Sequence, residues 1–300
     1  MAYLLLALAG VFWGGNYVAG HMLVGYINPY ALSILRWGLT SLLMFALYWK
    51  TIRKEWHLLT EHIALNTLYS FLGQVCFPLT LYIGLQYTSS LNASIYISAT
   101  PCLVLLINVL FFRERISARN VLGAVISTSG VIYLAFSNSD GVSSLSSFEI
   151  GDVLTIASAL SWAFYCALLR LKDKRVTHTA FVGFCSLVGT IILIPIYLAY
   201  LFFSKEPVVV SHGFSLYPLI VVVYLVIFPS WLAYVFWNKG VSMIGTTRSE
   251  IFTHIIPVSG GLLSILLLGE RLHTYHIISL VLIVCGIICC SGKNRKNDAD

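Results

Sequence analysis

The sequence has few charged residues. Only 10% of its 300 residues are Asp, Glu, Lys or Arg, whereas soluble domains carry about 25%. So few charges cannot cover the surface of a water-soluble globule, which excludes a soluble enzyme and a disordered chain. Hydrophobic residues make up 58% of the chain, and the mean hydropathy is +0.87. Apolar surface on this scale is stable in a lipid bilayer when it comes in spanning runs.

Motifs for catalysis, metal binding and nucleotide binding are also missing. The seven cysteines show no CxxC spacing and lie in apolar runs, where they are expected to pack as small hydrophobic residues. No GxxxxGK[ST] loop is present, so ATP-driven pumping is not expected. His273 and His276 form an isolated HxxH without a third ligand in register. We therefore expect no catalytic residue, no metal and no cofactor, and the scattered basic residues predict no nucleic-acid partner.

Ten apolar runs account for most of the chain. A helix of about 20 residues crosses the hydrocarbon core of a bilayer, and the runs lack the alternation of barrel strands. The predicted fold is an all-α membrane protein with ten transmembrane helices. The predicted spans are 2–20, 29–49, 62–84, 90–112, 117–136, 151–170, 178–203, 215–237, 246–268 and 273–291. The longest predicted breaks between them are 50–61, 137–150 and 204–214.

The sequence repeats itself at a constant offset of 156 residues. The matching pairs are Pro101 and Pro257, Glu114 and Glu270, Arg115 and Arg271, Gly84 and Gly240, and Gly130 and Gly286. Each copy holds five predicted helices, and because five is odd the two copies face opposite ways across the membrane. Inverted repeats predict alternating access to a central site. The alternative is a duplication that only builds a stable bundle. The predicted divisions are a first repeat 1–136, a Ser-rich linker 137–150, a second repeat 151–291 and a cytoplasmic tail 292–300.

Basic residues set the predicted orientation. With the N-terminus in the cytoplasm, nearly all Lys and Arg residues outside the spans lie on the cytoplasmic side, Lys205 and Arg271 excepted. The positive-inside rule therefore predicts that both termini are cytoplasmic.

Several residues resemble one family of membrane proteins. The first span contains the segment Ala9–Asn16 with its Trp13-Gly14 pair, the second contains Arg36, and each half has a Pro-to-Glu helix end. This set resembles the drug/metabolite transporter superfamily, specifically its EamA-type members. The second copy departs from the pattern, because Trp162-Ala163 replaces Trp-Gly. The resemblance covers nearly the whole chain and implies an inner-membrane carrier that often exports amino acids or related metabolites, although members differ in substrate.

Ionisable residues inside the predicted spans are candidates for function, because burying them is costly. Arg36 is predicted to attract a substrate carboxylate, and the alternative is a structural arginine held by carbonyls or tyrosines. Glu250 and His254 lie four residues apart and share a helix face. His254 is interpreted as a proton relay or a solute contact, with a neutral hydrogen-bonded histidine as the alternative. The predicted depths of Arg36 and Glu250 differ by about 13 Å, so no direct pair is expected.

Polar and aromatic residues within the spans are predicted to line a central cavity, with plain packing as the alternative. Besides Arg36, Glu250 and His254, the predicted substrate-binding residues are Trp13, Asn16, Tyr17, Gln74, Tyr82, Asn92, Tyr96, Trp162, Tyr165, Trp231 and Tyr234. Aromatic residues at span ends are assigned instead to an interfacial belt; these are Tyr3, Trp49, Trp56 and Trp237. Pro101 and Pro257 are predicted hinges or kinks that shape packing, and the alternative, compatible with this, is that the carbonyls they free, those of Ile97 and Thr253, accept a hydrogen bond from a substrate ammonium. A predicted gate comprises Glu114, Arg115, Glu270 and Arg271, and solvated helix ends are the alternative.

These observations predict a secondary-active transporter in the cytoplasmic (inner) membrane. Its partners are a small-molecule solute and the lipid bilayer, and the chain is expected to act as a monomer. The expected solutes are amino acids or related amphipathic metabolites, moved outward by alternating access. The alternatives are a strict exchanger of organic anions in the same superfamily, an intramembrane enzyme, and a scaffold that transports nothing.

Overall fold

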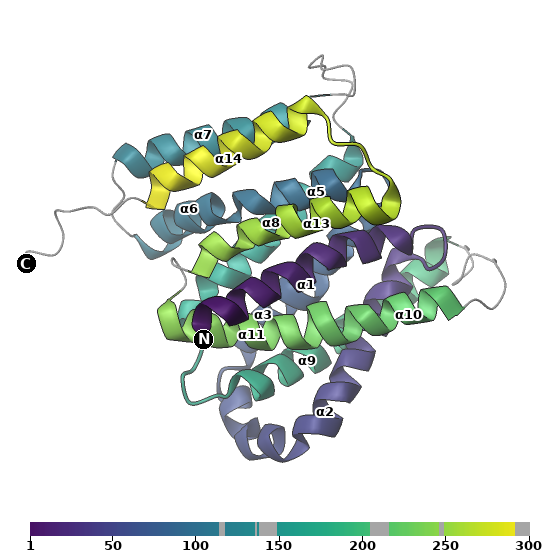
Figure 1. Cartoon of the computed structure of the whole chain (residues 1–300). Helices are drawn as coiled ribbons and strands as arrows, with labels where there is room; N and C mark the ends of the chain where they lie inside the picture. The colour runs from purple at the N-terminus through teal and green to yellow at the C-terminus, as the bar shows by residue number, and fades with distance from the viewer. Residues whose placement is uncertain (114–117, 136, 138–148, 205–215, 246–248, 292–300) are drawn as a thin grey trace, which may run out of the picture.

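The computed structural model describes residues 1–113, 118–135, 137, 149–204, 216–245 and 249–291 (Figure 1). The regular elements in these ranges are all helices, which confirms the predicted all-α class. The α-helices are α1 (Ala2–Met22), α2 (Pro29–Glu61), α3 (Ile63–Ser70), α4 (Phe77–Gly84), α5 (Ser90–Tyr96), α6 (Thr100–Phe112), α7 (Ala118–Ala135), α8 (Ile150–Leu168), α9 (His178–Ser204), α10 (Leu216–Leu225), α11 (Ala233–Ile244), α13 (Ile255–Leu263) and α14 (Thr274–Ser291). The π-helical segments are η1 (Phe71–Cys76), η5 (Val226–Leu232) and η7 (Ser264–Leu268), and the 3₁₀ segments are η2 (Ile97–Ala99), η4 (Leu169–Leu171) and η6 (Glu250–His254).

Six helical stretches among the described residues are long and apolar enough to cross a membrane. They are Ala2–Met22, Pro29–Glu61, Ser90–Phe112, Ile150–Leu171, His178–Ser204 and Leu216–Ile244. Shorter apolar helices cover Val121–Leu134, Phe252–Leu268 and Thr274–Gly286. The chain is thus built as a multi-pass membrane protein, and the full set of ten crossings stays a prediction.

The second helix is longer than predicted. The break expected at 50–61 is helical, and α2 continues through it with a kink at Tyr48 (φ −122°, ψ 19°). In this extension Ile52 and Leu59 are buried while most of the polar residues face outward. The apolar residues recur at helical spacing, so the segment forms an amphipathic helix rather than a loop.

Local sequence signals fix where several helices begin. Asn28 caps α2, because its side-chain oxygen accepts a hydrogen bond from the Ala31 amide at 2.8 Å, and Pro29 occupies the first turn. Ser89 caps α5 in the same way through the Asn92 amide at 3.1 Å. Glu149 begins α8 with a capping box. These caps satisfy amides that would otherwise be unpaired at helix starts.

Changes of helix type accompany the prolines predicted as hinges. The 3₁₀ segment η2 comes directly before α6 with Pro101 in its first turn, and η6 comes directly before α13 with Pro257. Proline removes a backbone donor, which favours such local changes of hydrogen-bonding pattern. The carbonyl of Ile97 accepts the Thr100 hydroxyl at 2.6 Å. Movement at these positions stays a prediction.

Several helices pack side by side in pairs (Figure 1). Helix α7 runs along α14 at one edge of the bundle, and α2 runs along α9 at the opposite edge. Between them α1 packs against α13 and α11, while α8 packs against α4 and α6. Close approach of α1 to α13 depends on Gly14, where a Cβ would lie 2.7 Å from the Gly260 amide nitrogen.

Candidate functional site

Arg36 lies fully buried where four helical stretches meet. Its Nε donates a hydrogen bond to Ser230 Oγ of η5 at 2.5 Å. Its Nη1 donates to Asn16 Oδ1 of α1 at 2.7 Å and to the Tyr82 hydroxyl of α4 at 2.5 Å. The Tyr82 hydroxyl also donates to Asn16 Oδ1 at 3.0 Å. We call these four residues the Arg36 centre.

The charge of Arg36 has no carboxylate partner among the described side chains. Its guanidinium carbon lies 5.0 Å from the Trp37 ring centroid and 5.7 Å from that of Tyr82. Arg36 Nη2 and Asn16 Nδ2 are buried without a hydrogen-bond partner. A guanidinium stays protonated in proteins, so the centre combines a fixed positive charge with two unused donors. Such a group is complementary to an anionic oxygen.

A layer of aromatic side chains lies beside the Arg36 centre, and its members are Trp13, Trp162, Tyr165, Tyr234 and Trp237. The Trp13 and Trp162 rings are 4.8 Å apart, and Trp162 stacks on Tyr165 at 4.9 Å. Tyr234 contacts Trp37 at 5.3 Å, which links this aromatic layer to the neighbour of Arg36.

Hydrogen bonds to backbone carbonyls fix two of these rings. Trp13 Nε1 donates to the Pro229 carbonyl at 3.0 Å, and the Tyr234 hydroxyl donates to the Gly73 carbonyl at 2.6 Å. Both acceptors lie in π-helical segments, η5 and η1. A π turn re-aims backbone groups within a helix, and such turns are frequent at functional sites.

The structure brings together most of the predicted substrate-binding residues in one buried cluster, namely Trp13, Asn16, Tyr17, Arg36, Tyr82, Trp162, Tyr165 and Tyr234. Three members of the surroundings were not predicted. Ser230 and Trp37 gave no signal, because a single serine or tryptophan in an apolar run is ordinary in a membrane helix. The assignment of Trp237 to an interfacial belt is wrong, since its side chain is 0% exposed and contacts Trp13 at 5.2 Å.

Other predicted residues lie apart from the Arg36 centre. Asn92 Oδ1 is 3.0 Å from His276 Nε2, and Tyr96 packs in a second apolar cluster with Ile283. Trp231 is partly buried and contacts Tyr48. The side-chain amide of Gln74 in η1 donates hydrogen bonds at 3.1 Å to the carbonyls of Tyr69 and Ser70, which lie in the preceding α3. The contacts of these four residues are with other parts of the protein and not with the Arg36 centre, which favours a role in helix packing.

Among the remaining ionisable candidates, His254 lies in η6 with both ring nitrogens buried and without hydrogen-bond partners. Glu250 also lies in η6, but its side chain falls outside the described part of the chain. Glu114 and Arg115 lie outside the described residues altogether. A proton-relay role for His254 stays a prediction.

Glu270 makes a well-defined contact at one end of the bundle. Its carboxylate accepts hydrogen bonds from the Ser90 amide at 3.0 Å, the Leu91 amide at 3.0 Å and the Ser90 hydroxyl at 2.7 Å. The adjacent Arg271 is exposed. Gly269, at φ +68°, ends η7 in the left-handed region and turns the chain toward the start of α5. We call this contact the Glu270 cap.

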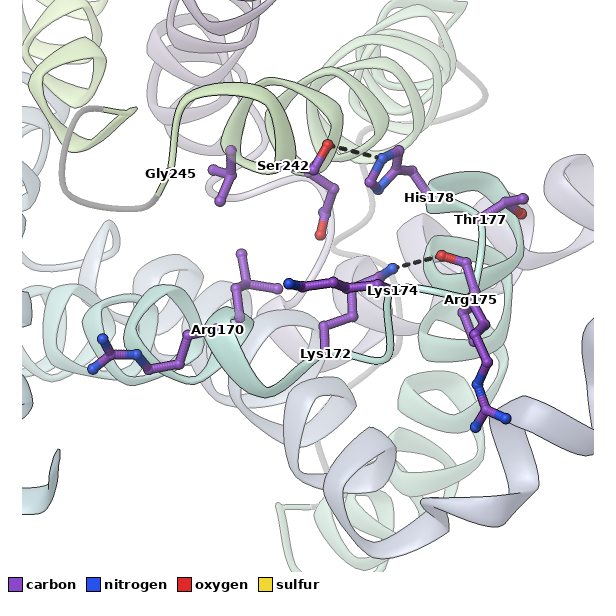
Figure 2. Close-up of a pocket in the computed structure, with 12 residues that line it drawn as sticks. Arg170, Lys172, Lys174, Arg175, Thr177, His178, Ser242 and Gly245 are labelled. Carbon is purple, nitrogen blue, oxygen red and sulfur yellow. Dashed lines mark hydrogen bonds between the residues drawn. The ribbon is translucent and has the colours of Figure 1, made fainter.

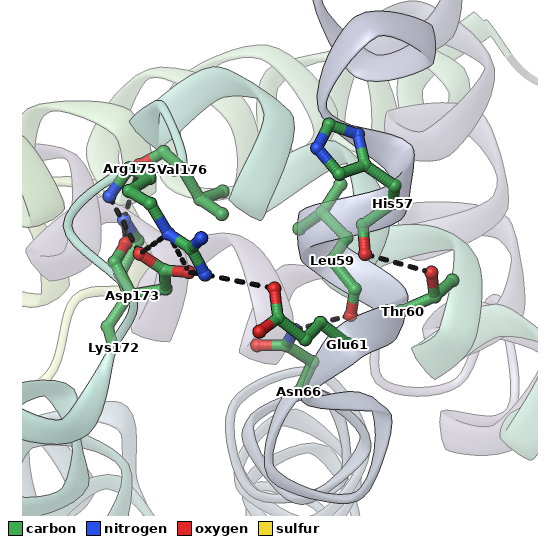
Figure 3. Close-up of polar contacts among 9 residues, drawn as sticks. All are labelled: His57, Leu59, Thr60, Glu61, Asn66, Lys172, Asp173, Arg175 and Val176. Carbon is green, nitrogen blue, oxygen red and sulfur yellow. Dashed lines mark hydrogen bonds and ion pairs between the residues drawn. The ribbon is translucent and has the colours of Figure 1, made fainter.

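A surface ion-pair network surrounds Arg175 in the connection between α8 and α9 (Figure 3). Its guanidinium donates to Asp173 at 2.7 Å and to Glu61 of α2 at 2.9 Å. Hydrogen bonds from Arg175 lower the pKa of Asp173 to about 2. Glu61, His62 and Asp173 lie close enough to share a cation. Arg175 already neutralises the two carboxylates, so the group is accounted for as an ion-pair network.

Comparisons with known proteins agree with this architecture. The chain matches the EamA-like transporter family over residues 1–136 and 149–292. It is 27% identical to the uncharacterized transporter YetK of Bacillus subtilis (strain 168) over 301 residues, which cover 99% of this chain and 89% of YetK. The uncharacterized inner membrane transporter YicL of Salmonella typhimurium (strain LT2) is 24% identical over 96% of this chain and 94% of YicL. A crystal structure matches the fold with a TM-score of 0.67 and 20% identity, covering 97% of this chain and 96% of that one.

Proposed function

Since this chain belongs to the EamA-like transporter family, and is therefore a membrane transporter of small solutes rather than an enzyme, we propose that it carries a carboxylate-bearing solute through the Arg36 centre. The observation that carries this proposal is the buried guanidinium of Arg36 with an unused donor and no carboxylate beside it in the described structure. A buried charge without a counterion is costly in a membrane protein, so it is retained where it serves a ligand. The family includes members that differ in cargo, so the site and not the fold argues for the class of solute.

The aromatic layer indicates which other groups the solute carries besides its carboxylate. Trp13 and Trp162 present ring faces and edges next to the Arg36 centre, and Trp162 Nε1 has no hydrogen-bond partner. Rings of this kind accept an apolar side chain, and they attract an ammonium group through cation–π contacts. Amino acids and related amphipathic carboxylates combine these features. We therefore retain them as the proposed cargo.

Alternating access between two inverted five-helix repeats is the proposed mechanism, with ten crossings, divisions near 1–136 and 151–291, and both termini in the cytoplasm. Packing supports it, because exchanging the two halves maps the contact of α1 with α11 onto that of α8 with α4. Gly84 and Gly240, which are related by the 156-residue offset, make equivalent contacts. Gly84 packs against α8, the first helix of the second repeat, and Gly240 packs against α1, the first helix of the first repeat. Pseudo-equivalent contacts of this kind are what two exchangeable halves require.

The direction of transport is proposed to be outward, by the family resemblance. A strict exchanger of organic anions is the second candidate within transport. The buried charge of Arg36, which has no carboxylate partner in the described structure, also favours this exchanger. A site that always holds an anion must release one before it binds the next. Countertransport distinguishes the two: an exchanger moves labelled solute only when unlabelled anion is present on the other side.

A charge-selectivity assay tests the role of Arg36. Proteoliposomes are loaded with a panel of labelled amino acids, and each transported acid is compared with the analogue in which an uncharged carboxamide group replaces the carboxylate. We expect Arg36→Gln to remove the preference of the carrier for the carboxylate over the carboxamide, while Arg53→Gln on the exposed face of α2 leaves it unchanged. Arg36→Lys keeps the charge but not the planar fork, so an intermediate preference is expected.

The carboxylate-to-carboxamide ratio separates recognition from folding. A purely structural arginine would lower the flux of both compounds together in Arg36→Gln and leave their ratio at the wild-type value. That result would refute the proposal. Failure of every carboxylate in the panel to move through the wild-type protein would refute the proposed class of solute.

A further inference from the structure

A second cationic site lies at one end of the bundle, away from the Arg36 centre. A pocket of about 600 Å³ opens between the α8–α9 connection and the C-terminal end of α11 (Figure 2). We call it the basic pocket. Basic side chains of 170–175 lie on one side of it, and Ser242 and Gly245 lie on the other. Its lining in the described structure includes four Lys and Arg residues and no carboxylate; the four are Arg170, Lys172, Lys174 and Arg175.

Two of the four charges already have defined partners or surroundings. Arg175 points away from Ser242 and pairs with Asp173 and Glu61, so its charge is neutralised outside the pocket. Arg170 lies with its guanidinium carbon 4.7 Å from the Phe112 ring centroid. The positive charge of the pocket therefore comes chiefly from Lys172 and Lys174.

Lys172 is held in place without a carboxylate contact in the part of the chain that the structure describes. Its ammonium donates to the carbonyls of Val176 at 2.7 Å and Asp173 at 3.3 Å, and lies 5.1 Å from the Phe181 ring centroid. Burial lowers the pKa of Lys172 to about 8. A partly desolvated ammonium with only neutral acceptors gains from an anionic ligand. The titratable groups that act on this ammonium or lie beside it are Asp173, Glu55, His178, Cys185 and Lys174.

The inner wall of the basic pocket is continuous with the aromatic layer. Asn238 lines the pocket but is only 3% exposed. Its amide nitrogen donates to the Tyr165 hydroxyl at 3.2 Å and to the Tyr234 carbonyl at 2.8 Å. Tyr234 in turn contacts Trp37, the neighbour of Arg36. The aromatic layer thus separates two sites that both favour anions.

We propose that the basic pocket is an anion-binding vestibule, in which Lys172 and Lys174 hold the carboxylate of the solute before it passes Asn238 and the aromatic layer to reach Arg36. This inference rests on the proposed function, because a vestibule requires a transported solute. A cleft lined by one sign of charge concentrates ligands of the opposite sign and speeds their association. The phosphate of an anionic lipid offers the same chemistry, and the experiment separates the two sources.

Site-specific protection from alkylation tests the vestibule. Ser242→Cys places a thiol on the pocket wall of the full-length protein in phosphatidylcholine nanodiscs, and modification at position 242 is read by peptide mass spectrometry. Benzoate is the probe, and benzamide is its uncharged analogue. We expect benzoate to slow the modification and benzamide to leave it unchanged. In Lys172→Met/Lys174→Met the benzoate concentration for half-protection should rise about tenfold or more.

Two further variants separate charge from fold. Lys172→Arg/Lys174→Arg keeps both charges and should retain protection. Lys50→Met/Lys54→Met removes the same net charge from the exposed surface of α2 and should also retain it. Equal protection by benzoate and benzamide, or unchanged half-protection in the double methionine variant, would overturn the inference.

The remaining outcomes show whether a lipid headgroup occupies the pocket, and whether a failure concerns the vestibule or the proposed function. If nanodiscs containing phosphatidylglycerol protect position 242 without benzoate and abolish the effect of benzoate, a lipid headgroup occupies the pocket and the inference is overturned. Normal carboxylate flux in the double methionine variant would overturn the vestibule and leave the proposed function standing. Intact, lysine-dependent protection with no flux of any carboxylate would overturn the proposed function and leave only an anion site.

Discussion

Replacing Glu270 by glutamine removes one negative charge from the start of α5 while keeping the size of the side chain. In the native contact the carboxylate accepts hydrogen bonds from two backbone amides and one hydroxyl, those of Ser90 and Leu91. An amide group offers a single acceptor oxygen, so at least one of these bonds is lost. The charge also interacts favourably with the positive end of the helix dipole, and this term is lost too.

The expected loss follows from these two terms. A hydrogen bond to a charged group contributes about 1.5–3 kcal/mol, and a charge at a helix N-terminus about 0.3–1 kcal/mol. Because glutamine retains part of the bonding, we expect the Glu270 cap to weaken by about 2–3 kcal/mol in total, which corresponds to about a 30- to 150-fold change in the local opening equilibrium. The Ser90–Ser264 hydroxyl contact at 2.7 Å remains in the variant and limits the loss.

Hydrogen exchange measures this opening directly. The amides of Ser90 and Leu91 are bonded to the Glu270 carboxylate, so peptides covering 88–96 should exchange faster in Glu270→Gln by about that factor, since exchange reports local opening. Arg271→Gln changes a neighbouring exposed charge and should leave the exchange unchanged. Wild-type exchange rates in Glu270→Gln would refute the argument, because they would show that the carboxylate does not hold the start of α5.

Three shorter predictions use other parts of the structure. Benzoate protection at the basic pocket should weaken by up to about tenfold as pH rises from 7 to 9, because Lys172 with a pKa of about 8 loses its charge over this range, and Lys172→Arg should make the titration flat. Arg113→Gly should stabilise the protein against thermal unfolding by about 1 kcal/mol, because Arg113 ends α6 at φ 54°, and an unchanged melting curve would contradict this. Gly14→Ala should lower the yield of folded protein through overpacking of about 1–3 kcal/mol against α13, whereas Gly38→Ala, whose Cβ would meet its nearest atom at 3.7 Å, should not; equal yields would contradict the close contact.

The helices and the chemistry at the centre were accessible from the sequence for a physical reason. A buried polar residue in a membrane helix is costly, so Arg36 and Asn16 stand out against an apolar background. Helical spacing also placed Trp13 and Tyr17 on one face, and both lie in the buried cluster. These signals are local, since they need only composition, period and depth along one helix.

The contacts that the sequence did not predict depend on tertiary structure. Ser230 reaches Arg36 because η5 changes the helical register there, and a π turn has no clear sequence signature. Trp237 was assigned to the interface from its position along a span, but packing of α11 against α1 buries it. The basic pocket arises where the α8–α9 connection folds toward the end of α11, so lysines expected to mark only orientation share a cavity with Asn238.

The two cationic sites, the basic pocket and the Arg36 centre, lie at different depths of the bundle, and in the proposed function one solute binds at each in turn. In the basic pocket Lys174 is exposed and Lys172 only partly buried, so water weakens the attraction of these charges for an anion. Arg36 offers a fixed charge that is 0% exposed and already oriented by Asn16 and Ser230, so an anion there binds in a desolvated site. The aromatic layer between them has no ionised group among its five members, so a carboxylate crossing it must be shielded by movement of the helices. The Glu270 cap ties the end of η7 to the start of α5, and α5 packs against both α1 and α13. A gating role for Glu270 and Arg271 stays a prediction.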